Sequence, residues 1–151
     1  MALLAKGTWV VLLDGEKALI CENTGTTRAP RLRLHAKMAQ ELEPQRELAT
    51  DRPGRMPDTG RNQRSAMEAT DFNRQAKERF AAEVAERVNR LADRAEIARL
   101  VIAAPPQLLS VLRDGLNGGV RGRVIAELPK TLTQHPLSAL GGKVADLVDP
   151  L

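Results

Sequence analysis

With 151 residues, 42% of them hydrophobic and 28% charged, the chain is expected to form a single soluble domain covering residues 1–151. The net charge of +4 permits a polyanionic partner, but only 2% of the residues are aromatic, which argues against recognition of bases by aromatic stacking. The single cysteine, Cys21, excludes an intrachain disulfide, and its place in an apolar run predicts a small buried side chain.

Residues 1–20 are largely apolar, but four charged side chains interrupt them. No uninterrupted stretch reaches the ~18 apolar residues that a membrane span requires, and no signal-peptide pattern is present. We therefore expect a cytoplasmic protein without membrane insertion.

The first elements are predicted to be the strands of an antiparallel meander. Thr8–Leu13 and Lys17–Glu22 flank the turn signal Asp14-Gly15, which indicates a hairpin. Arg31–Met38 alternates basic and apolar residues, so one face of this third strand is expected to be buried and the other basic. The basic face would carry Arg31, Arg33 and His35. An unpaired edge of the meander would allow a homodimer to form.

An irregular segment at about residues 43–70 is predicted to follow. Its main part, "TDRPGRMPDTGRNQRSAMEATD" (Thr50–Asp71), has prolines, glycines and no apolar periodicity. Irregular segments of this length in compact domains are usually functional or disordered. The arginines of this segment offer planar donor groups suited to phosphates or carboxylates, so two interpretations stay open: a mobile solvated loop, or a tip that orders on RNA or an acidic partner. These arginines are Arg52, Arg55, Arg61 and Arg64.

The strongest helical pattern runs from Asp71 to Ala95, where apolar residues recur at spacings of three and four. Thr70 or Asp71 is expected to cap its first turn. The apolar run Arg99–Pro106 predicts a buried strand of a parallel sheet. A helix at residues 107–116, a glycine-rich loop at 115–122, a strand at Gly122–Lys130 and a helix at 135–149 complete the order.

This order predicts an α/β fold with a mixed five-stranded sheet, in which an antiparallel three-strand meander precedes strand-helix units. The same order occurs in ribonuclease-H-like folds, an analogy that concerns the fold and not the function.

The sequence offers no catalytic, metal or cofactor site. Asp14 lacks a companion carboxylate of the kind that two-metal nucleases use, and a lone Asp-Gly pair is typical of a hairpin turn. With only His35, His135 and Cys21, no zinc-ligand spacing exists. The glycine-rich "GLNGGVRG" follows a helix and lacks the Lys-Ser/Thr of a phosphate-binding loop. We therefore predict a non-enzymatic protein without cofactors.

Several motifs together resemble a bacterial family described as host attachment proteins. They are "WVVLLDGEKALICENTG", "DRPGR", Met67-Glu68, "LVIAAPPQLLSVLR" and "ELPKTLT", which span nearly the whole chain. That family is similar to the middle domain of archaeal and eukaryotic class-1 release factors. The resemblance implies the same fold type and a link to attachment to host cells.

In those release factors, the loop that enters the long helix carries a Gly-Gly-Gln motif that promotes peptidyl-tRNA hydrolysis on the ribosome. The corresponding place here holds Gly60-Arg61-Asn62-Gln63. The second glycine is replaced and an extra residue is present. Glycine serves there for unusual backbone angles and close approach. The motif is therefore not intact, which counts against a retained hydrolytic activity.

Two main hypotheses result, with peptidyl-tRNA hydrolysis as a third. The first is a cytoplasmic module that binds the ribosome, structured RNA or an acidic partner and affects attachment indirectly. The second is a surface factor that attaches by direct protein contact; the missing export signal counts against it. The candidate contact residues of the first hypothesis are Arg33, Arg52, Arg55, Gly60, Arg61, Asn62, Gln63 and Arg64.

Overall fold

The structure, a computed structural model, describes residues 4–40, 59–95 and 97–148. Five strands form one mixed sheet in the order β3-β2-β1-β4-β5. β1 pairs antiparallel with β2 and parallel with β4, while β2–β3 is antiparallel and β4–β5 parallel. The predicted α/β fold with a mixed five-stranded sheet is thereby confirmed. The strands are β1 (Trp9–Leu13), β2 (Lys17–Asn23), β3 (Leu32–Ala39), β4 (Leu100–Ala103) and β5 (Val124–Leu128).

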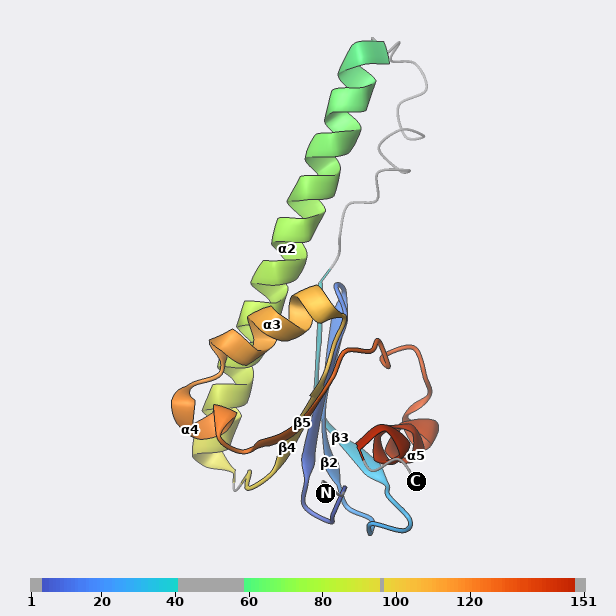
Figure 1. Ribbon diagram of the computed structural model, residues 1–151, viewed down its shortest axis with the longest axis vertical. Coiled ribbons are helices and arrows are strands. Elements are labelled where there is room, and N and C mark those ends of the chain that lie inside the picture. The colour runs from blue at the N-terminus through green and yellow to red at the C-terminus, as the bar shows by residue number, and fades with distance from the viewer. Residues whose placement is uncertain (1–3, 41–58, 96, 149–151) are drawn as a thin grey trace.

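Helices cover both faces of the sheet (Figure 1). One face carries α2 (Thr59–Arg94), α3 (Pro106–Gly115) and the short α4 (Gly118–Arg121). The other face carries α5 (Leu137–Val148). The crossover from β3 through α2 leads to β4, which is parallel to β1, and the crossover from β4 through α3 and α4 leads to β5, which is parallel to β4. These parallel pairings follow the predicted alternation of strand and helix patterns.

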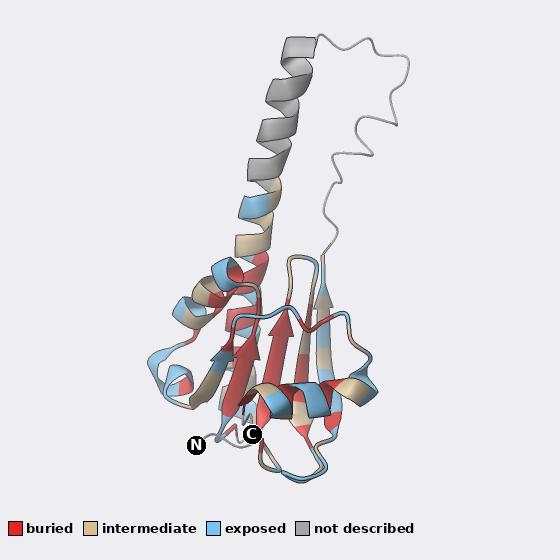
Figure 2. Cartoon of the chain, turned by 45° about the vertical axis from the view of Figure 1, so that its right-hand side comes forward, coloured by how far each residue is buried: buried red, intermediate tan, exposed pale blue. Residues whose placement is uncertain are grey.

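The core is aliphatic and has two layers, one on each face of β1 (Figure 2). Trp9, Val11 and Leu13 belong to the layer beneath α2 and α3, whereas Val10 and Leu12 belong to the layer beneath α5. Because β1 is central and covered on both faces, all of its residues are buried. Cys21 is fully buried as predicted, and burial raises the pKa of its thiol to about 11.

Helix α2 begins at Thr59, so the expectation of an irregular backbone up to residue 70 is wrong for residues 59–70. The sequence from Thr59 to Thr70 lacks proline and is rich in alanine, arginine, glutamine, glutamate and methionine, which have high helix propensity. The missing apolar periodicity misled the prediction. This part of α2 extends beyond the end of the sheet (Figure 1), where a helix needs no apolar stripe.

Strand β3 departs from the predicted alternation because it contains a β-bulge. Ile20 pairs with Ala36 and Cys21 with Leu34, so His35 is an extra residue in the ladder. The bulge changes which residues face the core: Ala36 packs in the layer of α2, whereas Leu34, predicted to be buried, is 39% exposed. Arg31, Arg33 and His35 are exposed, as expected.

The glycine-rich residues 115–122 were predicted to form only a loop, but they include helix α4. The side chain of Asn117 accepts a hydrogen bond from the Val120 N–H at 2.9 Å and thereby caps this turn. Asn89 of α2 donates to the Gly115 carbonyl and accepts from the Asn117 N–H, both at 3.0 Å. These contacts fix the end of α3 against α2.

Candidate functional site

The distal end of α2 carries five of the predicted contact residues. Gly60, Arg61, Asn62, Gln63 and Arg64 lie in its first turns, at the end that projects away from the sheet (Figure 1). Arg52 and Arg55 lie outside the described residues. The four-residue counterpart of the release-factor motif is therefore helical, which differs from the irregular backbone that a double glycine would favour.

The base of this projecting helix is fixed by Gln40, which directly follows β3. Its side-chain amide donates to the Gly15 carbonyl at 2.9 Å and to the Ala76 carbonyl at 3.2 Å. Its backbone N–H donates to the Glu16 carbonyl at 2.8 Å. One side chain thus joins the end of β3, the β1–β2 turn and α2. From Ala76 to Gly60 the helix rises about 24 Å.

A cleft of about 390 Å³ lies beside this junction, at the carboxyl ends of β1 and β4. Lys77 crosses the β1–β2 turn there: a Cβ added to Gly15 would come within 2.7 Å of three carbons of the Lys77 side chain. The cleft holds basic groups and one carboxylate, from Glu78. Its lining consists of Gly15, Arg74, Lys77, Glu78, Pro105, Pro106, Gln107 and Leu108.

Asp14 directly follows β1, beside this junction. Both of its carboxylate oxygens accept hydrogen bonds that hold the turn together. Its Oδ1 accepts from the backbone N–H groups of Glu16 at 2.6 Å and Lys17 at 2.8 Å. Its Oδ2 accepts from the hydroxyl of the buried Thr133. The residue is the hairpin-turn acid that the sequence predicted, and it also ties the turn to the segment before α5. Over residues 4–40, 73–95 and 97–148, no three His, Cys, Asp or Glu side chains gather as metal ligands would.

Arg33 lies on the exposed edge strand β3 and not at the tip of α2. The structure therefore does not bring Arg33 and the Gly60–Arg64 segment into one site. It places them on two separate surfaces, and the Gln40–Ala76 hydrogen bond links the end of β3 to α2 between them.

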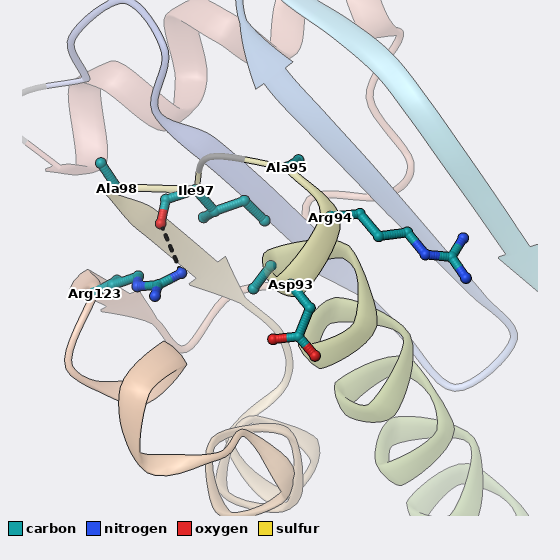
Figure 3. A pocket seen from close by; sticks show the side chains of 7 residues that line it. Asp93, Arg94, Ala95, Ile97, Ala98 and Arg123 are labelled. Atoms are coloured by element: carbon teal, nitrogen blue, oxygen red, sulfur yellow. Dashed lines mark hydrogen bonds between the residues drawn. The ribbon is translucent and has the colours of Figure 1, made fainter.

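A second cavity, of about 500 Å³, lies at the other end of α2 (Figure 3). The Arg123 guanidinium donates to the Ile97 carbonyl at 3.1 Å, so it is held by the backbone. The side chains of Asp93 and Arg94 point away from one another in Figure 3. The polar groups do not converge, and we assign no function to this cavity.

Sequence reasoning missed Gln40 and Lys77. No sequence signal identifies them, because their roles depend on contacts between segments that are 25 and more residues apart. Lys37, which extends the basic character of β3, was within the predicted strand but was not singled out.

The comparisons with known proteins point to one family. Residues 7–144 match the sequence profile of bacterial archaeo-eukaryotic release factor family 12. No curated protein sequence matches the chain. No helix in the described ranges is long and apolar enough to span a membrane. Because the match covers nearly the whole chain and agrees with the resemblance to release factors, the chain belongs to bacterial archaeo-eukaryotic release factor family 12.

Proposed function

We propose that this protein is a translation-associated, non-enzymatic module that binds the ribosome or structured RNA through the distal end of α2 and the arginine-bearing residues before it. Membership of a release-factor family supports a role linked to translation. The strand order β3-β2-β1-β4-β5 supports a ribonuclease-H-like arrangement of the kind found in the release-factor middle domain.

The observation that carries the proposal is the position of residues 60–63. They lie at the tip of a helix that extends beyond the sheet, with its base fixed by Gln40 (Figure 1). A tip held on a rigid helix can enter a recess in a large partner, and Arg61 and Arg64 supply charges that favour phosphate. Arg52 and Arg55 precede them in the sequence.

The replacement of the motif's second glycine supports a binding role without hydrolysis. Arg61-Asn62 stands where the release-factor loop has glycine, and the backbone there is helical. A helical backbone cannot supply the strained close approach for which glycine is used. We therefore expect no hydrolysis of peptidyl-tRNA by this protein. An effect on attachment to host cells would be indirect, through the synthesis of surface components.

Ribosome co-sedimentation tests the proposal. We expect the protein to sediment with ribosomes at low salt and to be released as the salt concentration rises. The double variant Arg61→Ala/Arg64→Ala should lose this association. The control Arg87→Ala/Arg90→Ala removes the same charge from exposed positions near the other end of α2 and should retain it. Equal sedimentation of both variants would remove the tip of α2 from the proposal.

A hydrolysis assay and cell fractionation separate the other hypotheses. Release of peptide from peptidyl-tRNA on ribosomes, abolished by Gln63→Ala, would favour the enzymatic alternative. Recovery of the protein wholly outside the cell would favour a surface factor that acts by direct protein contact.

A further inference from the structure

The edge strand β3 and the loop before it form a second charged surface, remote from the tip of α2. Residues 24–40 contain basic side chains and no Asp or Glu. β3 is at one end of the sheet order, so one of its edges has no strand partner within the described residues. Figure 2 shows this strand largely as exposed. We call this surface the β3 edge and define it by Arg28, Arg31, Arg33 and His35, all of which are exposed. Lys37 is also exposed, but it pairs with Leu19 and faces the α5 side of the sheet.

The cations of the β3 edge have no ion-pair partner within the described ranges. The ion pairs in the described part of the chain join Arg113 to Asp114 and to Glu127, away from β3. Glu22 is directly opposite Arg33 in the β2–β3 ladder, yet the two side chains form no ion pair within 4.0 Å. The unpaired basic side chains of the loop and strand outnumber the nearby carboxylate of Glu22, which raises the local potential and attracts a polyanion.

His35 adds a flat ring to this surface. Its ring packs edge-on against Trp9, with ring centroids 4.9 Å apart and an interplanar angle of 67°. Trp9 is only 4% exposed and belongs to the core layer beneath α2, so it supports His35 from within. The exposed side of a supported imidazole is a platform on which an unstacked base can stack.

We propose that the β3 edge binds the backbone of single-stranded RNA, with Arg31 and Arg33 on phosphates and His35 stacked against a base. This inference rests on the proposed function and names the chemistry of a second contact surface for it. From Arg31 to His35 the chain spans about 13 Å, so the surface covers a few nucleotides. β3 ends at Ala39, and the next residue, Gln40, contacts α2 at Ala76, so the RNA strand continues from this edge toward the tip of α2.

The observations favour RNA over an acidic peptide. A peptide that bound here by strand addition would need an unbroken ladder edge, but the bulge at His35 interrupts it. An acidic peptide would also make no use of the supported imidazole. Pairing of two β3 edges from separate copies is opposed as well, since like charges would face each other.

Binding of a short mixed-sequence single-stranded RNA to the full chain tests the inference. The variant Arg31→Ala/Arg33→Ala should weaken binding about tenfold at low salt, and the slope of log K against log salt should fall by about 1.4. The control Arg87→Ala/Arg90→Ala removes the same charge from exposed positions elsewhere and should change neither quantity. All of these side chains are on the surface, and urea unfolding checks that each variant is folded.

Trp9 provides an independent readout, because it is the only tryptophan and touches His35. RNA binding should change its fluorescence. His35→Ala should abolish this change and weaken binding about tenfold, as removal of a stacking ring does. His35→Phe, which keeps a flat ring, should restore binding. If His35 had only a structural role, His35→Ala would be less stable and His35→Phe would not restore RNA binding.

The outcomes separate this inference from the proposed function. The α2-tip variant is Arg61→Ala/Arg64→Ala and the β3-edge variant is Arg31→Ala/Arg33→Ala. Loss of RNA binding in the α2-tip variant, with no change in the β3-edge variant and constant Trp9 fluorescence, would overturn the inference and leave the proposed function standing. If both variants kept full ribosome binding, the proposed function and this inference would both be overturned. Two further results would also overturn the inference: tight binding of polyglutamate with no binding of RNA, or self-association of the β3-edge variant with unchanged RNA affinity.

Discussion

The side-chain amide of Gln40 donates a hydrogen bond of 3.2 Å to the backbone carbonyl of Ala76, in the middle of α2. The same amide donates to Gly15 in the β1–β2 turn. Because Gln40 directly follows β3, these contacts join the end of the edge strand and the β1–β2 turn to the helix that extends beyond the sheet (Figure 1). The tip of α2 is therefore oriented by a residue of the meander.

Loss of the Gln40 amide should destabilise the fold. Gln40→Ala removes the two hydrogen bonds to Gly15 and Ala76, and we expect the free energy of unfolding to fall by about 1–3 kcal/mol. Urea unfolding measures this. The control is Gln134→Ala, since Gln134 is exposed and makes no side-chain hydrogen bond within the described part of the chain. An equal change in both variants would contradict the assigned role.

The Thr133 hydroxyl should contribute to stability through Asp14. Thr133→Val keeps the shape of the side chain but leaves Oδ2 of Asp14 without its donor. We expect a loss of about 1–3 kcal/mol in unfolding free energy. In the background Asp14→Ala, the same substitution should have a much smaller effect, because the partner is already missing. Additive effects in this double-mutant cycle would exclude a coupling between the two residues.

Neighbouring glycines in α5 should respond in opposite directions to alanine. A Cβ at Gly141 would lie 2.8 Å from the Pro30 carbonyl oxygen, so Gly141→Ala should destabilise the protein by about 1–3 kcal/mol. A Cβ at Gly142 meets nothing within 4 Å, so Gly142→Ala should stabilise the helix by up to about 1 kcal/mol. Thermal unfolding of the two variants compares these effects at adjacent positions of one helix.

Cys21 should be unreactive in the folded protein and should make stability sensitive to high pH. Its thiol pKa is raised by burial from 9.0 to about 11. The folded state therefore binds the proton more tightly than the unfolded state. This contribution is fully present below pH 9.0 and is lost as the pH rises toward about 11.

Urea unfolding at pH 8, 9, 10 and 11 measures this effect against Cys21→Ala, which should show a flatter dependence over the same range. A thiol reagent at pH 8 should label Cys21 only after unfolding. Rapid labelling of the native protein would contradict the burial of the thiol.

The sequence predicted the elements well where one physical signal dominated. The alternation of apolar runs and helical stripes gave the strand and helix order, and Asp14-Gly15 gave the hairpin. It failed at His35, because a bulge is set by pairing with Ile20 and Cys21 across the sheet and not by local pattern. It also failed at Thr59, where helix propensity acts without burial.

The candidate site was predictable only in part. The positions of Arg33 and of residues 60–64 as candidate contacts came from charge and from the resemblance to release factors. Their separation on two surfaces could not be derived, because it depends on the length of α2 and on the contact between Gln40 and Ala76. The support of His35 by Trp9 joins residues 26 positions apart and leaves no sequence signature.

The number of residues in α2 determines how far its tip reaches and in which direction the tip residues point. Each residue between Ala76 and Gly60 advances the tip by about 1.5 Å and rotates it by about 100°. A single insertion there would turn residues 60–63 away from their present direction with little change in reach. An insertion of seven would nearly restore the direction and extend the reach by about 10 Å. The length of α2 thus sets both the reach and the direction of residues 60–63 toward any partner. A relative with a different spacing would present the same four residues at a different depth.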